Sequence, residues 1–204
     1  MNNNNNYKEY LLDQYHTVFK EIDLLMNSKD KVLVAIDGNS GAGKSTLSEI
    51  LESIYSCNVF HMDHFFLRPE LKTKERLDEV GGNVDYVRFN DEIIKGLKSG
   101  QDFKYQIYNC QIEKLDKYIS VFPRKLNIIE GVYSMHPVLI DNYDLKIFLR
   151  IDHKKQSHRI LERNGNIIHQ KFMNLWIPLE NEYFEQFKIK EKSQIVIDVS
   201  DKEK

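Results

Sequence analysis

Residues 38–45 constrain the fold of this chain most strongly, because they place a glycine-rich turn between a strand pattern and a helix pattern. They read GNSGAGKS. The preceding residues 31–36 (KVLVAI) are apolar and β-branched, which is typical of a buried parallel strand. Residues 44–55 have the spacing of a helix. A strand, a tight turn and a helix in succession favour a parallel α/β sheet.

The turn matches the pattern G-x-x-x-x-G-K-[ST], whose chemistry is phosphate binding. Its glycines let successive N–H groups face one phosphate chain, and the following helix adds the positive end of its dipole. Lys44 is expected to reach the β- and γ-phosphates, and the Ser45 hydroxyl to bind Mg²⁺. A chance glycine turn is the other interpretation, but both flanking elements argue against it. The predicted phosphate-binding residues are Gly38, Asn39, Ser40, Gly41, Ala42, Gly43, Lys44, Ser45 and Thr46.

The remaining segments alternate between helix and strand patterns. The predicted helices are 7–27, 44–55, 86–97, 152–163 and 172–187. The further predicted strands are 58–62, 126–129, 145–151 and 194–199. The aromatic runs 103–108 and 118–122 alternate, which favours a hairpin over the site. Pro178 is expected to interrupt the last helix.

This alternation predicts an α/β fold of three layers, with helices on both faces of a parallel sheet, as in P-loop NTPases. We find no internal repeat and no linker in the 204 residues. We therefore expect a single domain over 1–204, with an N-terminal helix at 7–27 and a core at 31–199. At roughly 100–200 residues per domain, the length agrees with this expectation.

Composition and charge argue against several classes of protein. The formal net charge is -2, from 29 basic and 31 acidic residues, so no basic field attracts nucleic acid. No apolar run approaches the ~20 residues that span a bilayer, and the N-terminal asparagine tract lacks a signal-peptide pattern. Cys57 and Cys110 are isolated, which fits a reducing cytoplasm. We expect a cytoplasmic protein whose partner is a small molecule rather than a nucleic acid or a membrane. No heptad or clear interface stripe in the sequence indicates whether the protein is a monomer or a homo-oligomer.

Two acidic residues follow predicted strands, at the carboxyl ends where open parallel sheets bind ligands. Asp63 follows the strand 58–62, and Glu130 follows the strand 126–129. Phosphoryl transfer to a hydroxyl needs a carboxylate that takes the proton of the acceptor, and acidic groups around Mg²⁺. We expect Asp63 to be the general base, with a contact to metal-bound water, and Glu130 to belong to the metal shell. Either residue could instead cap a helix or pair with an arginine.

Arg159 and Arg163 lie four residues apart, so they share one face of the predicted helix 152–163. On a lid that closes over a nucleotide, this face would stabilise transition-state charge. A solvated basic face is an equally good interpretation. His64, beside Asp63, is a candidate contact for the acceptor, whereas His61 is expected to pack or bond locally.

Four segments, in their order along the chain, resemble motifs of the uridine kinase family of P-loop kinases. This family is related to phosphoribulokinase and pantothenate kinase. The four segments are 38–45 (GNSGAGKS), 61–66 (HMDHFF), 82–86 (GNVDY) and 128–131 (IIEG). The resemblance covers roughly residues 32–198. It implies a nucleoside monophosphate kinase-like sheet with a small lid at about 152–175. It also implies ATP or GTP as phosphate donor, Mg²⁺, and a hydroxyl as acceptor.

The resemblance also implies roles for individual residues. Asp63 matches the general base of the family, and Asp85 matches the acid that holds the ribose hydroxyls. Tyr105 falls near an aromatic residue that lies beside the base of the nucleoside. Cys110 stands nearest the position where members active on uridine usually carry a histidine. A thiol is a weaker hydrogen-bond partner than an imidazole, so the resemblance leaves the acceptor open.

These residues favour an ATP-dependent kinase that transfers a phosphate to a hydroxyl of a nucleoside such as uridine or cytidine. A kinase for pantothenate or a sugar phosphate would use the same machinery with another acceptor. A regulatory ATPase without a small acceptor is a third hypothesis. The sequence contains neither the N-K-x-D guanine motif nor the L-S-G-G-Q signature of transporter ATPases, so this third hypothesis has little support.

Overall fold

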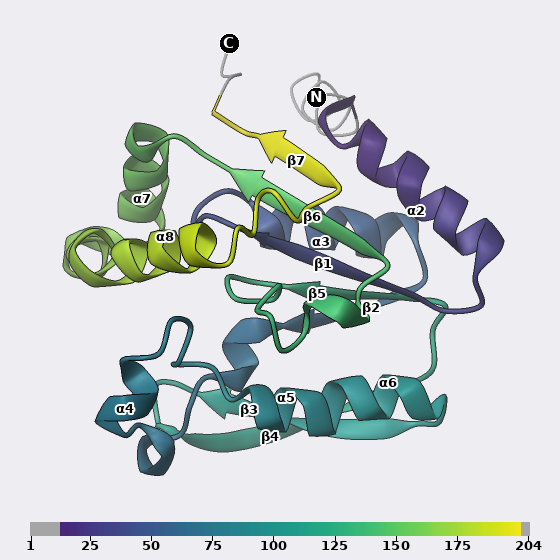
Figure 1. The fold of residues 1–204 in the computed structure, drawn as a ribbon, viewed down its shortest axis with the longest axis horizontal. Helices are drawn as coiled ribbons and strands as arrows, with labels where there is room; N and C mark the ends of the chain where they lie inside the picture. The colour runs from purple at the N-terminus through teal and green to yellow at the C-terminus, as the bar shows by residue number, and fades with distance from the viewer. Residues whose placement is uncertain (1–12, 201–204) are drawn as a thin grey trace, which may run out of the picture.

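A five-stranded parallel sheet forms the centre of the computed structural model, which describes residues 13–200 (Figure 1). The strands are β1 Val32–Gly38, β2 Cys57–His61, β5 Leu126–Glu130, β6 Leu145–Arg150 and β7 Ile195–Asp198. They lie in the order β2-β5-β1-β6-β7, and every neighbouring pair is parallel. The carboxyl ends of the strands therefore meet at one edge of the sheet, where ligands bind in folds of this kind.

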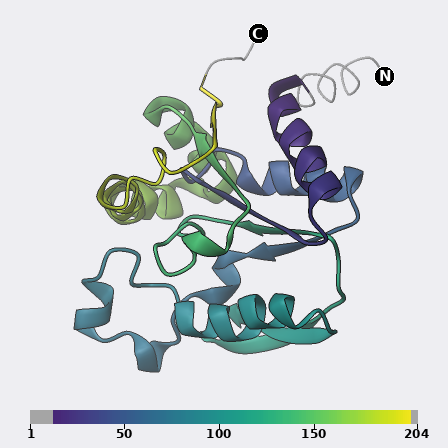
Figure 2. The same ribbon diagram turned by 45° about the vertical axis from the view of Figure 1, so that its right-hand side comes forward.

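Helices cover both faces of this sheet (Figures 1 and 2). The long elements are α2 His16–Ser28, α3 Lys44–Ile54, α7 His153–Lys171 and α8 Ile177–Gln186, with a π-helical turn η5 Phe172–Trp176 between the last two. A continuous helical run consists of α5 Tyr86–Phe89, the π-helical turn η3 Asn90–Ile94 and α6 Lys95–Ser99. Short turns are η1 Met62–Phe65, η2 Pro69–Leu71, α4 Lys74–Leu77 and η4 Ile140–Asn142. The predicted three-layer α/β/α fold with a parallel sheet is confirmed.

Strand β1 shows why the sheet is buried on both faces. All of its residues are buried. Val34 and Ile36 pack in the cluster that includes α2 and α3, whereas Leu33 and Ala35 pack in the cluster that includes the α5–α6 run. Successive side chains of a strand point to opposite faces, so a strand between two helical layers must be apolar throughout.

The two aromatic runs pair as a hairpin, as predicted. Strands β3 Phe103–Asn109 and β4 Lys114–Val121 are antiparallel and form a sheet separate from the parallel one. The hairpin lies along the α5–α6 run in the lower part of Figure 1. Tyr105 is buried in the main core, so the aromatic face of the hairpin attaches it to the domain.

Three predicted helices have different limits in the structure. Helix α2 ends at Ser28, and the predicted residues 7–12 lie outside the described residues. The helix predicted at 152–163 extends to Lys171, with a kink at Gly165. The predicted interruption near Pro178 is wrong, because the chain stays helical through this residue. The helix is only wider just before it, in the π-helical turn η5. Pro178 lies in the first turn of α8, where a missing N–H is tolerated.

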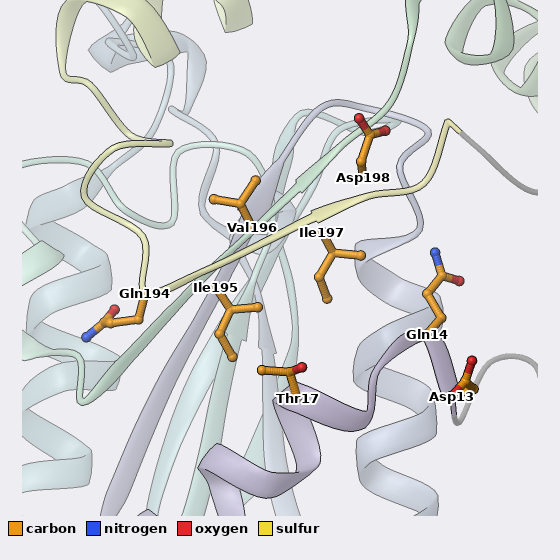
Figure 3. Close-up of a pocket in the computed structure, with 8 residues that line it drawn as sticks. All are labelled: Asp13, Gln14, Thr17, Gln194, Ile195, Val196, Ile197 and Asp198. Atoms are coloured by element: carbon orange, nitrogen blue, oxygen red, sulfur yellow. The ribbon is translucent and has the colours of Figure 1, made fainter.

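A recess of about 470 Å³ lies between β7 and the start of α2 (Figure 3). It is lined by Asp13, Gln14, Thr17, Gln194, Ile195, Val196, Ile197 and Asp198. None of the residues predicted to bind phosphate, metal or acceptor lies in this recess. Across residues 13–200, no helix has both the length and the apolar character needed to span a membrane.

His136, in the loop after β5, makes the stability of the fold depend on pH. Its ring stacks on Tyr86 with centroids 4.1 Å apart. Burial lowers the pKa of His136 to about 4 from 6.5; the charge of Arg76 also lowers it, whereas the Val80 carbonyl and Glu79 act in the opposite direction. Between these two values the unfolded chain binds a proton that the folded chain does not. We therefore expect His136 to lower the free energy of unfolding as the pH decreases from about 6.5 to about 4.

We expect His136→Phe to lose less stability on acidification than the wild-type protein. Phenylalanine keeps a ring against Tyr86 but removes the titrating group. Urea unfolding at a pH near 7 and at a pH near 4.5 measures the loss for each protein. Equal losses in the two proteins would contradict this assignment, because all other titrating groups are shared.

Candidate active site

The glycine-rich loop joins β1 to α3 at the carboxyl edge of the sheet. Gly38 pairs with Leu149 of β6 and has a φ of 132°. A Cβ atom at Gly38 would lie 2.0 Å from the Leu149 carbonyl oxygen, so only glycine fits there. Gly43, with a φ of 92°, precedes α3 and provides no side-chain cap. The first N–H groups of α3 are therefore left without a side-chain acceptor, as a helix start that binds anions requires.

Lys44 folds back into the loop, where its side chain is buried. Its ammonium group donates hydrogen bonds to the carbonyl oxygens of Gly38, at 2.7 Å, and Asn39, at 3.1 Å. Its charge stabilises the ionised forms of four carboxyl groups from separate elements, which are Asp37, Asp63, Glu130 and Glu180. The loop lysine thus lies where these elements converge.

Glu130 ends β5 directly opposite His61 of β2. The His61 Nδ1 atom lies 2.6 Å from Glu130 Oε1, and the Ser45 hydroxyl donates to the same oxygen at 3.3 Å. Burial alone would raise the pKa of Glu130, but His61, Lys44 and Ser45 together hold it below its ordinary value. Glu130 is therefore a carboxylate at neutral pH, and the local bond predicted for His61 is confirmed.

Asp63 lies in the η1 turn, immediately beyond β2, and the residue is exposed. Neighbouring protein atoms nevertheless displace part of the hydration of its carboxyl group. This loss of hydration raises the pKa of Asp63, the charge of Glu130 raises it further, and Lys44 and Arg163 act to lower it. A carboxylate whose pKa is raised is a stronger base and is better suited to accept a proton.

His64 and Tyr105 bring the η1 turn and the hairpin together next to Asp63. The His64 Nδ1 atom lies 3.2 Å from the Tyr105 hydroxyl, and the two rings are stacked. Burial lowers the pKa of His64 to about 4, and the charge of His61 adds to this effect. His64 is therefore neutral at pH 7, so it can donate and accept one hydrogen bond each.

Asp85 is buried and caps α5, because its Oδ1 atom accepts a hydrogen bond from the Arg88 backbone N–H at 3.0 Å. The Arg88 side chain joins the surrounding segments. It donates to the carbonyl oxygens of His64 and, at 2.6 Å, Gln106, and it contacts Glu92 at 3.3 Å. Arg88 thus holds the η1 turn, the hairpin and the α5–α6 run together, a role that sequence reasoning did not anticipate.

Cys110 lies in the turn that connects β3 and β4 and is exposed. Partial burial raises the pKa of its thiol, and the charge of Asp63 adds to that rise, while Lys72 opposes it. The thiol is therefore protonated at neutral pH. The electrostatic influence of Asp63 places Cys110 on the same side of the molecule as the predicted base.

Comparison with known proteins then decides the family. Residues 33–166 match the model of the Phosphoribulokinase / Uridine kinase family. The chain belongs to this family. The resemblance seen in the sequence motifs is therefore confirmed.

Two relatives illustrate the range of activities named within the family. The chain is 25% identical over 175 residues to a uridine kinase of Ureaplasma parvum serovar 3, covering 79% of this chain and 84% of that protein. It is 28% identical over 141 residues to a phosphoribulokinase of Synechocystis, covering 65% of this chain and 42% of that protein. Membership indicates an ATP-dependent kinase, and these identities leave the acceptor open.

Solved structures of related proteins share the fold. A possible uridine kinase from Bacillus stearothermophilus superimposes with a TM-score of 0.70 at 20% identity, covering 93% of this chain and all of that one (100%). The phosphoribulokinase from Rhodobacter spheroides superimposes with a TM-score of 0.54 at 12% identity, covering 83% of this chain and 70% of that one. At these identities the comparison shows the P-loop kinase fold alone.

The two arginines predicted for the lid of this kinase occupy different positions on α7. Arg159 donates from Nη1 to the Gly41 carbonyl oxygen at 3.1 Å, so it already touches the loop. Arg163 is exposed and donates to Asn164 Oδ1 at 2.8 Å. The charge of Arg163 lowers the pKa of Asp63, which places this arginine within electrostatic reach of the site. Their roles in catalysis stay predictions.

Asp37, which sequence reasoning overlooked, lies in β1 directly before the loop and is fully buried. Its Oδ1 atom accepts the Gly38 N–H at 2.7 Å, and its Oδ2 atom accepts the Met135 N–H at 2.9 Å and the Tyr183 hydroxyl at 2.8 Å. A signal was present, because a carboxyl group at the end of an apolar strand must find buried partners.

Proposed function

We propose that this kinase transfers the γ-phosphate of ATP to a hydroxyl group of a nucleoside such as uridine or cytidine. The observation that carries the proposal is the convergence of Lys44, Asp63 and Glu130 around the loop at the carboxyl edge of the sheet. Family membership supports phosphoryl transfer, and the uridine kinase from Ureaplasma supports a nucleoside acceptor.

Each residue in this arrangement has a distinct role in the proposed reaction. The acceptor hydroxyl lies beside Asp63, which takes its proton as the hydroxyl oxygen attacks the γ-phosphorus. A new O–P bond forms, the bond from the γ-phosphorus to the bridging oxygen breaks, and ADP leaves. Lys44 offsets the negative charge of the phosphates, and Arg159 and Arg163 add to this effect from a lid at about 152–175.

The oxygen atoms of Ser45 and Glu130 fit a Mg²⁺ ion, and Asp63 would contact such an ion through a metal-bound water. The Ser45 hydroxyl and a Glu130 carboxylate oxygen are already 3.3 Å apart, and oxygen donors are those that Mg²⁺ prefers. Among residues 13–200, no cluster of three histidine, cysteine or acidic side chains forms a ready-made cage. Mg²⁺ is commonly held by one or two carboxylates together with substrate phosphates, so this arrangement suits it. When bound, the ion would neutralise charge on the phosphates.

The residues around Asp63 support a neutral, hydroxyl-rich acceptor. The neutral imidazole of His64 and the Tyr105 hydroxyl provide polar groups without a positive charge. Asp85 and Cys110 complete the proposed acceptor side. Both terminal nitrogens of the Arg88 guanidinium already donate to protein carbonyls and its Nε atom is buried, which disfavours a second phosphate group on the acceptor.

The test is ADP release from Mg-ATP with a panel of uridine, cytidine, other nucleosides, pantothenate and sugar phosphates. We expect release that depends on uridine or cytidine. Release with another acceptor would keep the reaction and replace the substrate, whereas release without any acceptor would favour a regulatory ATPase. Lys44→Met serves as the inactive control for contaminating kinases, and repeating the panel with GTP compares the two donors.

A further inference from the structure

Helix α8 contacts the phosphate-binding loop through two buried side chains, Glu180 and Tyr183. Glu180 accepts the Ser40 N–H at 3.1 Å with one carboxylate oxygen and the Ser40 hydroxyl at 2.5 Å with the other. Tyr183 donates to Asp37 Oδ2 at 2.8 Å. Glu180 and Tyr183 are three positions apart and share one helix face, and Asp37 and Ser40 bracket the start of the loop. The two contacts from α8 therefore fix both ends of the short segment 37–40.

Side chains of helix α7 donate hydrogen bonds to backbone carbonyl oxygens in the same part of the loop. Gln156 Nε2 donates to the Ser40 carbonyl oxygen at 3.0 Å, and Arg159 donates to the Gly41 carbonyl oxygen at 3.1 Å. The N–H, the hydroxyl and the carbonyl of Ser40 are thus all bonded to α7 or α8. Ser40 anchors the loop to these helices, while the start of α3 carries no side-chain cap and keeps its N–H groups for a ligand.

Glu180 is an unusual group to find beside a phosphate site. It is 4% exposed, so its carboxylate has lost nearly all of its hydration. Its charge also has the same sign as the phosphates that the loop is proposed to bind. Such a group is unfavourable unless its interactions offset the cost of burial; the two bonds to Ser40 and the nearby charge of Lys44 oppose this cost, while burial still raises the pKa of Glu180.

We propose that Glu180 is a positioning residue. Together with Tyr183 it holds the loop in the conformation that binds a nucleoside triphosphate. This inference rests on the proposed function, because it takes the loop to be the nucleotide site. The hydrogen bonds to Ser40 predict that loss of Glu180 weakens nucleotide binding. Electrostatic repulsion predicts the opposite, so the sign of the effect tests the inference.

The experiment measures the Kd of a fluorescent ATP analogue with Mg²⁺, in the absence of any acceptor. We expect Glu180→Ala to raise the Kd by about 10-fold, because Ser40 loses the acceptor of two charge-assisted hydrogen bonds. Glu180→Gln is expected to raise it by only about 3-fold, since the amide oxygen still accepts one of them. Glu185→Ala removes an exposed glutamate from the same helix and is the matched control.

Tyr183→Phe provides an independent variant that keeps the buried ring and removes only the hydroxyl. We expect it to raise the Kd by about 3-fold through Asp37, with kcat at saturating ATP close to the wild-type value. A Kd that is unchanged or lower in both Glu180 variants would overturn the inference, even if their thermal stability without nucleotide fell. Wild-type protein that fails to bind the analogue would overturn the proposed function as well, which separates the two failures.

Discussion

Asp63→Asn is expected to slow phosphoryl transfer by about 10²- to 10⁴-fold, the usual contribution of a general base. Asparagine has nearly the same shape but cannot accept a proton from the acceptor hydroxyl. The affinity for Mg-ATP should not fall, because Lys44 and the loop are untouched and one negative charge near the phosphates is removed. Turnover is measured as acceptor-dependent ADP release, and affinity by titration with a fluorescent ATP analogue.

Asp78→Asn is the matched control for this prediction, since it makes the same change at an exposed acid outside the site. Its turnover should equal that of the wild-type protein. If Asp63→Asn kept more than about a tenth of wild-type turnover, the assignment of Asp63 as general base would be wrong. A loss confined to the affinity for Mg-ATP would instead assign Asp63 to nucleotide binding or to direct coordination of the metal.

Arg88→Leu is expected to lower the free energy of unfolding by about 3–5 kcal/mol, the range for breaking a buried charged contact. Arg88 is 9% exposed, and its guanidinium lies 4.1 Å from the Phe65 ring centroid. Leucine would leave the carbonyl oxygens of His64 and Gln106 without their donor and Glu92 without a cation. Urea unfolding at neutral pH measures the loss.

Two further variants sharpen this second prediction. Arg88→Lys keeps the charge but cannot reach several partners at once. Its free energy of unfolding should therefore lie between those of Arg88→Leu and the wild-type protein. Arg124→Leu makes the same change at an exposed arginine and should alter stability by less than about 0.5 kcal/mol. A loss of less than about 1 kcal/mol in Arg88→Leu would show that Arg88 does not hold the acceptor side together.

Contiguous patterns in the sequence were sufficient to predict the loop and the sheet around it. The apolar run of β1, the glycines and the helix that follows are constrained within a few neighbouring residues. The positions of Asp63 and Glu130 followed from the same logic, because a residue after a parallel strand must lie at the carboxyl edge. The hairpin was equally predictable from its alternating aromatic residues.

The limits of the helices were predicted less well, because small backbone adjustments set them. Pro178 would break an isolated helix, but here the wider η5 turn precedes it and the chain remains helical. Gly165 permits a kink within α7 that no periodicity reveals. Pro178 is tolerated because it lies in the first turn of α8, and the kink follows from the positive φ that glycine adopts without strain.

The amino-acid sequence by itself determined a phosphate-binding loop between a buried strand and a helix, with acidic residues at the same edge of the sheet. Only the tertiary structure decided which other charged groups serve that loop. Glu180 reaches Ser40 across 140 positions, and Tyr183 reaches Asp37 across 146. A buried charge is stable only beside its partners, and no local pattern reveals partners so far apart in the chain.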